Sequence, residues 1–200
     1  KKTLYGFIDL ITSIEGLEET PIFFSINKIP SYFTKKGISE INYYKYHLEN
    51  HYIKISSILD YTSHFINLVY SLGIPPRKCN PWSILENLNV KGTLVGNSFN
   101  AFNKHFENIK QNRNIIIHKG KYESEEIKSI DSTIMSSNLI KMDKILIDWF
   151  NERRQKEVQK VIEMFHQNNK AVSDHILNLS DNLVNPFINR YNYLKTLETE

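Results

Sequence analysis

The stretch ISSILDYTSHFINLVYSLGIPP, residues 55–76, indicates which kind of fold the chain adopts. Its apolar residues recur every three or four positions, which is the spacing of one face of an α-helix. The same spacing reaches back to Ser39, a suitable N-cap, and stops at Gly73 and the prolines that follow it. The pattern therefore predicts one helix over residues 39–72, of about nine turns.

Further amphipathic segments follow this helix. An apolar stripe predicts a second helix over residues 93–112, after a connection over 73–92. Two more long helices are expected after Gly120. The polar stretch 151–157 is either a solvated bend or an exposed part of one of them, and Pro186 predicts a kink near the end.

Glycine and proline are sparse, with seven and six residues in a chain of 200. Because glycine and proline commonly mark turns and helix breaks, their low number favours long helices over a β-fold with many turns. Residues 1–38 are the least regular, because prolines interrupt the aromatic run TPIFFSINKIPSYF (20–33). This segment is expected to be a strand or an extended arm. The sequence thus predicts an N-terminal extension over 1–38 and an all-α bundle of four or five helices over 39–200.

The composition is that of an ordinary globular protein, with 40% hydrophobic and 24% charged residues. No apolar run approaches the roughly 18 residues of a membrane span. Asp9 interrupts the apolar start and no cleavage site follows, so no signal peptide is expected. A single cysteine excludes an intramolecular disulfide and suits a reducing cytoplasm. The net charge of +3 is compatible with a polyanionic partner but is low for a dedicated duplex binder.

The stretch RNIIIH, residues 113–118, places an arginine and a histidine at the two ends of an isoleucine triplet. One interpretation is packing, in which the isoleucines fill a core while Arg113 and His118 face water. The other is chemistry, in which the two polar side chains handle a phosphate group. If the stretch is helical, five residues correspond to about 140° around the axis, so the two would not share a face. A local break or a site built by two protomers would then be needed.

The residues around Arg113 and His118 make a more specific pattern than these two residues alone. Asn114 follows the arginine directly, and Gly120 lies two residues after the histidine. The block RNIIIHKG resembles the signature of the HEPN superfamily (higher eukaryotes and prokaryotes nucleotide-binding domain), which is arginine, four to six residues with a polar one commonly first, and histidine. The resemblance covers residues 39–200, more in the order of helices than in detailed sequence.

The resemblance implies a fold and an activity. HEPN domains are all-α bundles, and many are metal-independent ribonucleases that dimerise so that two motifs meet in a cleft. They occur in toxin–antitoxin pairs, anti-phage systems and RNA-guided effectors. The resemblance therefore implies that Arg113, Asn114 and His118 are catalytic, with no metal and no cofactor. The expected partners are RNA, a second copy of the chain, and an antitoxin or defence protein.

The residue chemistry supports the same hypothesis. RNA is cleaved without metal when its own 2′-OH attacks the phosphorus. That reaction needs a group that moves protons near neutral pH, such as His118, and a fixed cation such as Arg113. Lys119, Lys121 and His105 are further candidates for RNA contacts. A solvated basic turn and a plain surface histidine explain these three residues as well.

Other candidate sites are weaker. His47 and His51 in HLENH are four residues apart, but the order of residues does not match a zinc protease and no third ligand is evident. Cys79 is expected to be a loop or core thiol. Tyr122 lies four residues after the histidine, whereas the HEPN branch with a modified tyrosine has it two residues after. The many aromatic residues are expected to pack in the core rather than to stack on bases.

Two rival hypotheses remain. The domain could be a non-catalytic HEPN-like module for nucleotide sensing or protein interaction. It could also be a helical partner-binding subunit in which Arg113 and His118 are incidental. A motif histidine that is buried away from any cleft would favour the non-catalytic module, whereas two motifs facing each other across a symmetric interface would favour the enzyme.

Overall fold

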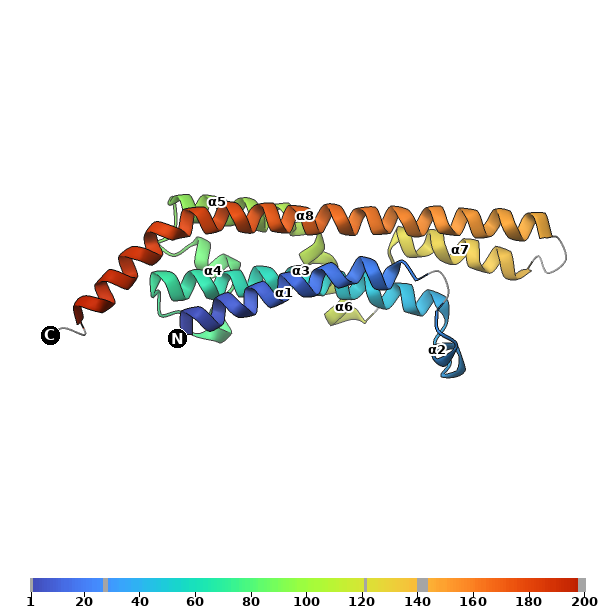
Figure 1. Ribbon diagram of the computed structural model, residues 1–200, viewed down its shortest axis with the longest axis horizontal. Coiled ribbons are helices and arrows are strands. Elements are labelled where there is room, and N and C mark those ends of the chain that lie inside the picture. Colours follow the sequence, from blue (N-terminus) through green and yellow to red (C-terminus); the bar gives the residue numbers. More distant parts are fainter. Residues whose placement is uncertain (1, 27–28, 121, 140–143, 198–200) are drawn as a thin grey trace. The chain divides into compact units, whose positions relative to one another are not determined.

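The computed structural model describes residues 2–26, 29–120, 122–139 and 144–197, and all regular elements in these ranges are helices (Figure 1). The α-helices are α1 (Lys2–Phe24), α2 (Ser31–Lys35), α3 (Glu40–Tyr70), α4 (Pro81–Leu85), α5 (Leu94–His105), α6 (Glu107–Lys119), α7 (Glu125–Leu139) and α8 (Lys144–Leu197). A 3₁₀ turn, η1, covers Pro76–Lys78. The predicted all-α class is confirmed, with more helices than the four or five expected.

Helix α3 agrees closely with its prediction. The hydroxyl of Ser39 accepts a hydrogen bond from the backbone N–H of Asn42 at 3.2 Å, as an N-cap should. The helix ends before Gly73, whose φ of +70° suits glycine. The side-chain amide of Asn67 then donates to the carbonyl of Ile74 at 2.9 Å and accepts from its N–H at 3.1 Å. These bonds fix the turn after the helix.

The second predicted helix is wrong in its extent. Instead of one helix over 93–112, α5 ends at His105 and α6 begins at Glu107. Phe106 lies between them with only 1% of its surface exposed, so burying this ring accompanies the break. The RNIIIH stretch therefore does not follow this helix but forms the last turns of α6, before the connection to α7.

The C-terminal part is formed by α7 and α8. The polar stretch 151–157, which the sequence left open as a bend or an exposed part of a helix, belongs to the unbroken helix α8 of 54 residues. Pro186 lies within this helix, and Figure 1 shows α8 bending in its red, C-terminal part. A proline removes one backbone hydrogen bond and its ring crowds the preceding turn, which accounts for the bend.

The prediction of a strand or arm near the N-terminus is wrong, because residues 2–24 form helix α1. Leu10, Leu17 and Phe24 recur at seven-residue spacing and are 3%, 1% and 0% exposed. Pro21 lies inside the helix, three residues before its end, where it removes one backbone hydrogen bond to the preceding turn. The division of the chain at residue 38 stays a prediction.

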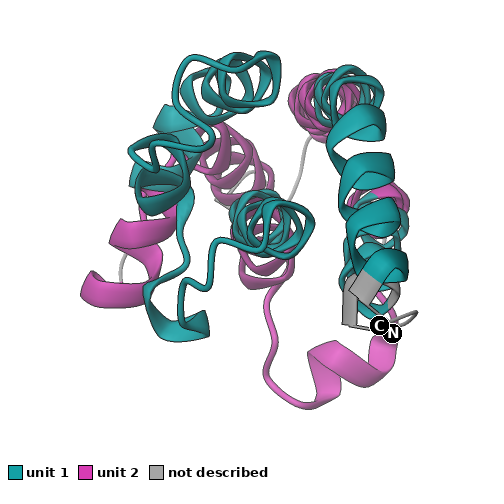
Figure 2. Ribbon diagram, turned by 90° about the vertical axis from the view of Figure 1, so that its left-hand side faces the viewer, with its two compact units in different colours: residues 1–17, 54–111, 169–200 teal, residues 18–53, 112–168 magenta. Residues whose placement is uncertain are grey.

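The chain forms two compact units, coloured separately in Figure 2. The first unit consists of residues 1–17, 54–111 and 169–200. Its apolar core draws on α1, α3, α5 and α8 and includes, among others, Leu10, Leu59, Ile66, Phe99, Phe102, Val172 and Leu183. Beside this core the amide of Asn182 donates to the hydroxyl of Ser98 at 2.8 Å.

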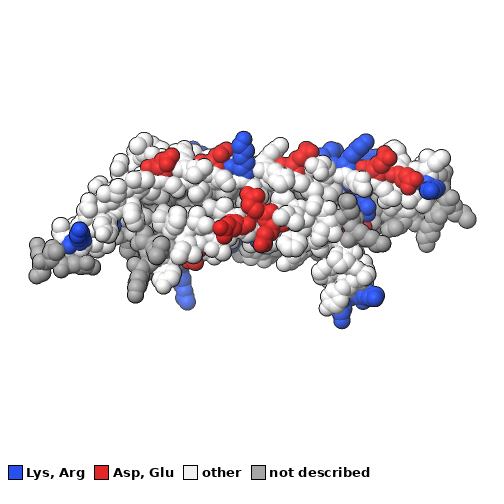
Figure 3. Space-filling model, in the orientation of Figure 1, with Lys and Arg blue, Asp and Glu red and all other residues white. Residues whose placement is uncertain are grey.

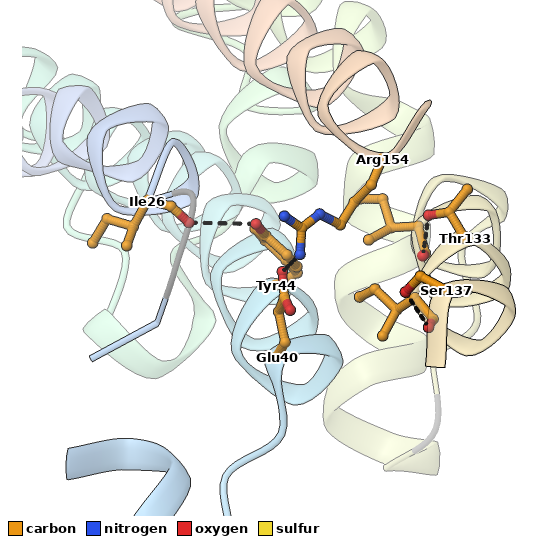
Figure 4. Close-up of polar contacts among 8 residues, drawn as sticks. Ile26, Glu40, Tyr44, Thr133, Ser137 and Arg154 are labelled. Carbon is orange, nitrogen blue, oxygen red and sulfur yellow. Dashed lines mark hydrogen bonds and ion pairs between the residues drawn. The ribbon is translucent and has the colours of Figure 1, made fainter. Parts of the chain in front are cut away.

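The second unit consists of residues 18–53 and 112–168, and therefore contains the RNIIIH stretch. Phe24 packs against Tyr44 and Phe165 at centroid distances of 4.9 and 5.1 Å. Arg154 donates to the carboxylate of Glu40 at 2.6 Å, as Figure 4 shows. The adjacent Tyr44 hydroxyl donates to the carbonyl of Ile26, and burial together with the charge of Glu40 raises the pKa of Tyr44 to about 12.

Candidate functional site

Helix α6 carries all residues of the RNIIIH stretch on continuous helical backbone. At 100° per residue, Ile117, Asn114 and His118 lie about 40°, 100° and 140° around the axis from Arg113. The predicted angular offset of Arg113 and His118 is thus present, and no break in the helix removes it. The four residues occupy one sector of the helix, with Arg113 at one border and His118 at the other.

Arg113 is half-buried, and its Nε atom is buried without a hydrogen-bond partner among the described residues. One of its terminal nitrogens, Nη1, donates to the side-chain carbonyl of Asn114 at 3.2 Å. No carboxylate in the described ranges forms an ion pair with it, whereas Arg154 is paired with Glu40. Arg113 is therefore a positive charge that has a neutral partner and no counter-ion among the described residues.

Asn114 and His118 are both exposed. Because they are four residues apart in a helix, their side chains lie on the same face. The side-chain carbonyl of Asn114 thus accepts a hydrogen bond from Arg113. His118 lies one helical turn after Asn114 on the same face of α6. No hydrogen bond from the ring of His118 to the described residues is present, so this protomer leaves its tautomer open.

The isoleucine triplet does not fill a core. Helix α6 contains no buried residue at all, and Ile117 is 48% exposed. Ile115 and Ile116 are half-buried and lie on the inward side of the helix. Ile117 instead lies between Arg113 and Asn114 in the outward sector. The packing interpretation of the stretch is therefore not what the structure shows.

The structure describes two of the three further residues predicted to contact RNA. Lys119 is exposed, but it follows His118 by one residue and so points about 100° further around the helix. Lys121 lies outside the described residues. His105 belongs to the first unit, where its ring lies 4.6 Å from that of Phe106 and 5.1 Å from that of His175. Sequence reasoning missed His175, since nothing near it in the sequence marks it.

The connection after α6 is held by a pair of tyrosines. The rings of Tyr52 on α3 and Tyr122 meet edge to face, with centroids 5.7 Å apart. Burial first, and then the neighbouring Tyr122 and Glu126, raise the pKa of the Tyr52 hydroxyl. Tyr122 is therefore a packing residue that ties the chain after His118 to α3.

The other candidates from the sequence are parts of cores. His47 and His51 are 9% and 0% exposed, and the ring of His51 lies 4.1 Å from that of Phe165. Cys79 is buried in the core of the first unit, and burial together with the charge of Asp60 raises the pKa of its thiol to about 11. A thiol that stays protonated at neutral pH is a poor nucleophile.

Three further findings concern surface charge, metal-binding groups and membrane spans. On the face drawn in Figure 3 acidic and basic side chains are interspersed along the upper edge, and a group of acidic side chains lies in the middle. In the part of the chain that the structure describes, no group of three or more His, Cys, Asp and Glu residues is arranged to hold a metal ion. Within the same ranges no helix has the length and apolar character needed to cross a membrane.

Comparison with known families agrees with this architecture. A family model described as Cthe2314-like HEPN matches residues 7–177, which is most of the chain. The chain therefore belongs to the HEPN class of all-α domains, and within it to the Cthe2314-like HEPN family. The superfamily membership predicted from the sequence is confirmed, and the match begins within α1. No curated protein and no solved structure matches the chain at a significant level.

Proposed function

We propose that this protein is a metal-independent endoribonuclease that cleaves RNA by attack of the internal 2′-OH, with Arg113, Asn114 and His118 as its catalytic residues. The observation that carries the proposal is the outward sector of α6. There an arginine without a counter-ion among the described residues is hydrogen-bonded to Asn114, and an exposed histidine lies one turn away from that asparagine. A phosphate group would supply the missing counter-ion.

The proposed reaction is an in-line displacement at phosphorus. The 2′-oxygen forms a bond to phosphorus as it loses its proton, and the bond from phosphorus to the 5′-oxygen breaks as that oxygen gains one. His118 moves the protons, because imidazole titrates near neutral pH. Arg113 stabilises the charge that develops on the phosphorane oxygens, and Asn114 orients the guanidinium. The products are a 2′,3′-cyclic phosphate and a 5′-OH.

This chemistry calls for two copies of the chain. One imidazole cannot take the proton of the 2′-OH and protonate the 5′-oxygen on the opposite side of phosphorus in the same step. A second His118, from another protomer, would fill the second role. The absence of any buried residue in α6 and the 48% exposure of Ile117 support a homodimer in which this helix is covered.

The remaining parts of the proposal rest on family analogy. Lys119, Lys121 and His105 are assigned to contacts with the RNA backbone. The setting is a toxin or anti-phage defence system in the cytoplasm, with an antitoxin or defence protein as a further partner. No metal or cofactor takes part.

The test is a cleavage assay with labelled single-stranded RNA in excess EDTA, followed by end-group analysis. We expect cutting that is insensitive to EDTA and that leaves cyclic phosphate ends. A DNA strand of the same sequence should resist, because it lacks the 2′-OH nucleophile. Cutting of DNA, or cutting that EDTA abolishes, would contradict the mechanism.

The rival function is a non-catalytic HEPN-like module that senses a nucleotide or binds a protein. One observation favours it, namely that none of the described residues of this protomer holds the ring of His118, whereas a catalytic histidine is usually oriented by a second group. This function predicts RNA or nucleotide binding that depends on Arg113, with no cleavage under any condition that leaves the dimer intact.

A further inference from the structure

A hollow in the second unit lies apart from the RNIIIH stretch. It has a volume of about 640 Å³ and opens between the end of α1, helix α2 and the first turns of α3. Five of its lining residues are rings: Phe23, Phe33, Tyr43, Tyr46 and His47. No residue of 113–118 lines it. Its size is that of pockets which hold small ligands or single groups of larger ones.

These rings differ from the aromatic residues of the core. Phe24 next to them is fully buried, whereas Phe23 is 46% and Tyr46 is 63% exposed. The sequence predicted that aromatic residues pack in the core, and at this hollow the prediction is wrong. Exposed aromatic rings that line a concave surface are a feature of binding sites.

The walls of the hollow are ordered by contacts within the chain. Phe23 stacks on His47, with centroids 5.4 Å apart and ring planes 10° from parallel. The edge of Tyr43 meets His47 at 4.4 Å, and the Tyr43 hydroxyl donates to the carbonyl of Phe23 at 3.0 Å. A ligand that enters the hollow therefore meets a rigid aromatic surface, so little binding free energy is lost in ordering these side chains.

The polar groups indicate what kind of ligand fits. None of the described residues that line the hollow has a charged side chain. The amide of Asn42, also in the lining, is exposed and makes no side-chain hydrogen bond to the described residues. Lys35 and Lys36 on the adjoining α2 segment are exposed and form no ion pair with a described carboxylate. The site thus suits a flat, uncharged ring with donors and acceptors on its edge, joined to a negatively charged group.

We propose that this hollow binds an unpaired base of single-stranded RNA. The base stacks on the exposed rings of Phe23 and Tyr46, the amide of Asn42 bonds to its edge, and Lys35 and Lys36 contact the adjacent phosphates. An apolar peptide segment would use the rings but neither the amide nor the lysines. The proposal rests on RNA being the substrate, but it concerns binding and is tested without cleavage.

The experiment measures the affinity of His118→Ala protein for a fluorescently labelled 10-nucleotide RNA by anisotropy. In this background Tyr46→Ala and Phe23→Ala should each weaken binding about 5- to 150-fold, the range for loss of one stacked base. Tyr61→Ala is the matched control, since Tyr61 is also an exposed tyrosine of α3 but lies outside the hollow. It should bind like the parent protein. Replacing Lys35 and Lys36 by glutamine should reduce the salt dependence of binding.

The proposal is overturned if Tyr46→Ala and Phe23→Ala bind RNA as tightly as Tyr61→Ala, or if the parent protein binds an apolar dye in the hollow but no RNA. Its failure is separable from failure of the ribonuclease proposal. Wild-type protein that cuts RNA while the hollow variants keep full affinity contradicts only the hollow. Wild-type protein that never cuts RNA, but loses affinity with Tyr46→Ala, contradicts only the catalytic proposal.

Discussion

The guanidinium of Arg113 donates a hydrogen bond to the side-chain carbonyl of its neighbour Asn114, at 3.2 Å. Consecutive residues of a helix point about 100° apart, so this bond draws the arginine toward the outward face on which Asn114 and His118 lie. Because the acceptor is a neutral amide oxygen, the bond does not neutralise the positive charge of Arg113. That charge can therefore interact with a negatively charged ligand. The asparagine thus compensates in part for the 140° offset of the motif.

Two substitutions of Arg113 should show how much of its effect on cleavage comes from its charge and how much from its planar pair of donors. Arg113→Ala should reduce the rate of RNA cleavage about 10²–10³-fold, because the phosphorane loses its stabilising donor. Arg113→Lys keeps the charge but not the planar pair of donors, so it should recover only part of the rate. Single-turnover cleavage rates measure both effects. Full activity of Arg113→Ala would exclude the proposed role.

Substitution of His118 should abolish proton transfer. His118→Ala is expected to lower the cleavage rate about 10²–10⁴-fold while RNA binding persists. His166→Ala is the control, because His166 is an exposed histidine of α8 in the same unit and should leave the rate unchanged. Equal rates for the two variants would show that His118 does not act in the reaction.

Ile117→Glu should disrupt the proposed dimer. A carboxylate in the middle of the covered sector would be desolvated without a partner and would repel its symmetry mate. Light scattering should then report a monomer, with helical content close to that of the wild type since Ile117 is half exposed. Lys119→Glu changes the charge on another side of α6 and should leave the oligomeric state unaltered. A dimer that persists in Ile117→Glu counts against this interface.

The histidine pair of the first unit predicts a pH dependence of stability. His175 stacks on Phe102 at 5.1 Å, and burial together with the charge of His105, opposed by Asp174, lowers the pKa of His175 below 6.5. The unfolded chain therefore binds a proton at a higher pH than the folded chain does. The stability that neutral His175 contributes is present above about pH 6.5 and is lost as the pH falls toward the folded pKa.

Urea unfolding at several pH values between about 5 and 8 measures this effect. His175→Phe keeps a ring on Phe102 but cannot titrate, so the free energy of unfolding should fall less steeply with acid than in the wild type. His166→Phe replaces an exposed histidine and should retain the wild-type slope. Identical slopes for wild type and His175→Phe would show that His175 does not contribute.

Gly96 in the first turn of α5 should tolerate no side chain. A Cβ atom at this position would lie 2.3 Å from the backbone carbonyl oxygen of Val90, which cannot move aside cheaply. Gly96→Ala should lower the free energy of unfolding by about 1–3 kcal/mol. Gly16→Ala in α1 meets nothing closer than 3.7 Å and should raise it by about 0.5–1 kcal/mol. Chemical denaturation compares the two.

Periodicity predicted the helices whose ends are marked by the sequence. Helix α3 was located to within two residues, because Ser39 caps its start and Gly73 takes the left-handed conformation after its end. The break at Phe106 carries no such mark, since burial of one ring in tertiary packing ends α5 there. Helix α1 was missed for the opposite reason. Proline marked this stretch as irregular, yet Pro21 lies inside α1, which continues to Phe24.

The candidate site was predictable in its residues but not in its geometry. Arg113, Asn114 and His118 follow from the motif, and the angular offset follows from helical geometry alone. The Arg113–Asn114 bond and the exposure of Ile117 depend on how α6 packs against the rest of its unit, which no local pattern encodes. The aromatic hollow was unpredictable for the same reason, because Phe23 and Phe24 differ only in which side of α1 is covered.

The assembly of the first unit from separated segments affects how the protein is made. Leu10 shares a core cluster with Leu183, although nearly the whole chain lies between them. A ribosome adds about 5–20 residues per second, so the apolar side of α1 waits on the order of ten seconds for its partners from α8. During that interval the nascent chain exposes surface that chaperones bind. Neither unit can therefore form before its part of α8 has been synthesised, and a fragment that ends before α8 has no finished core.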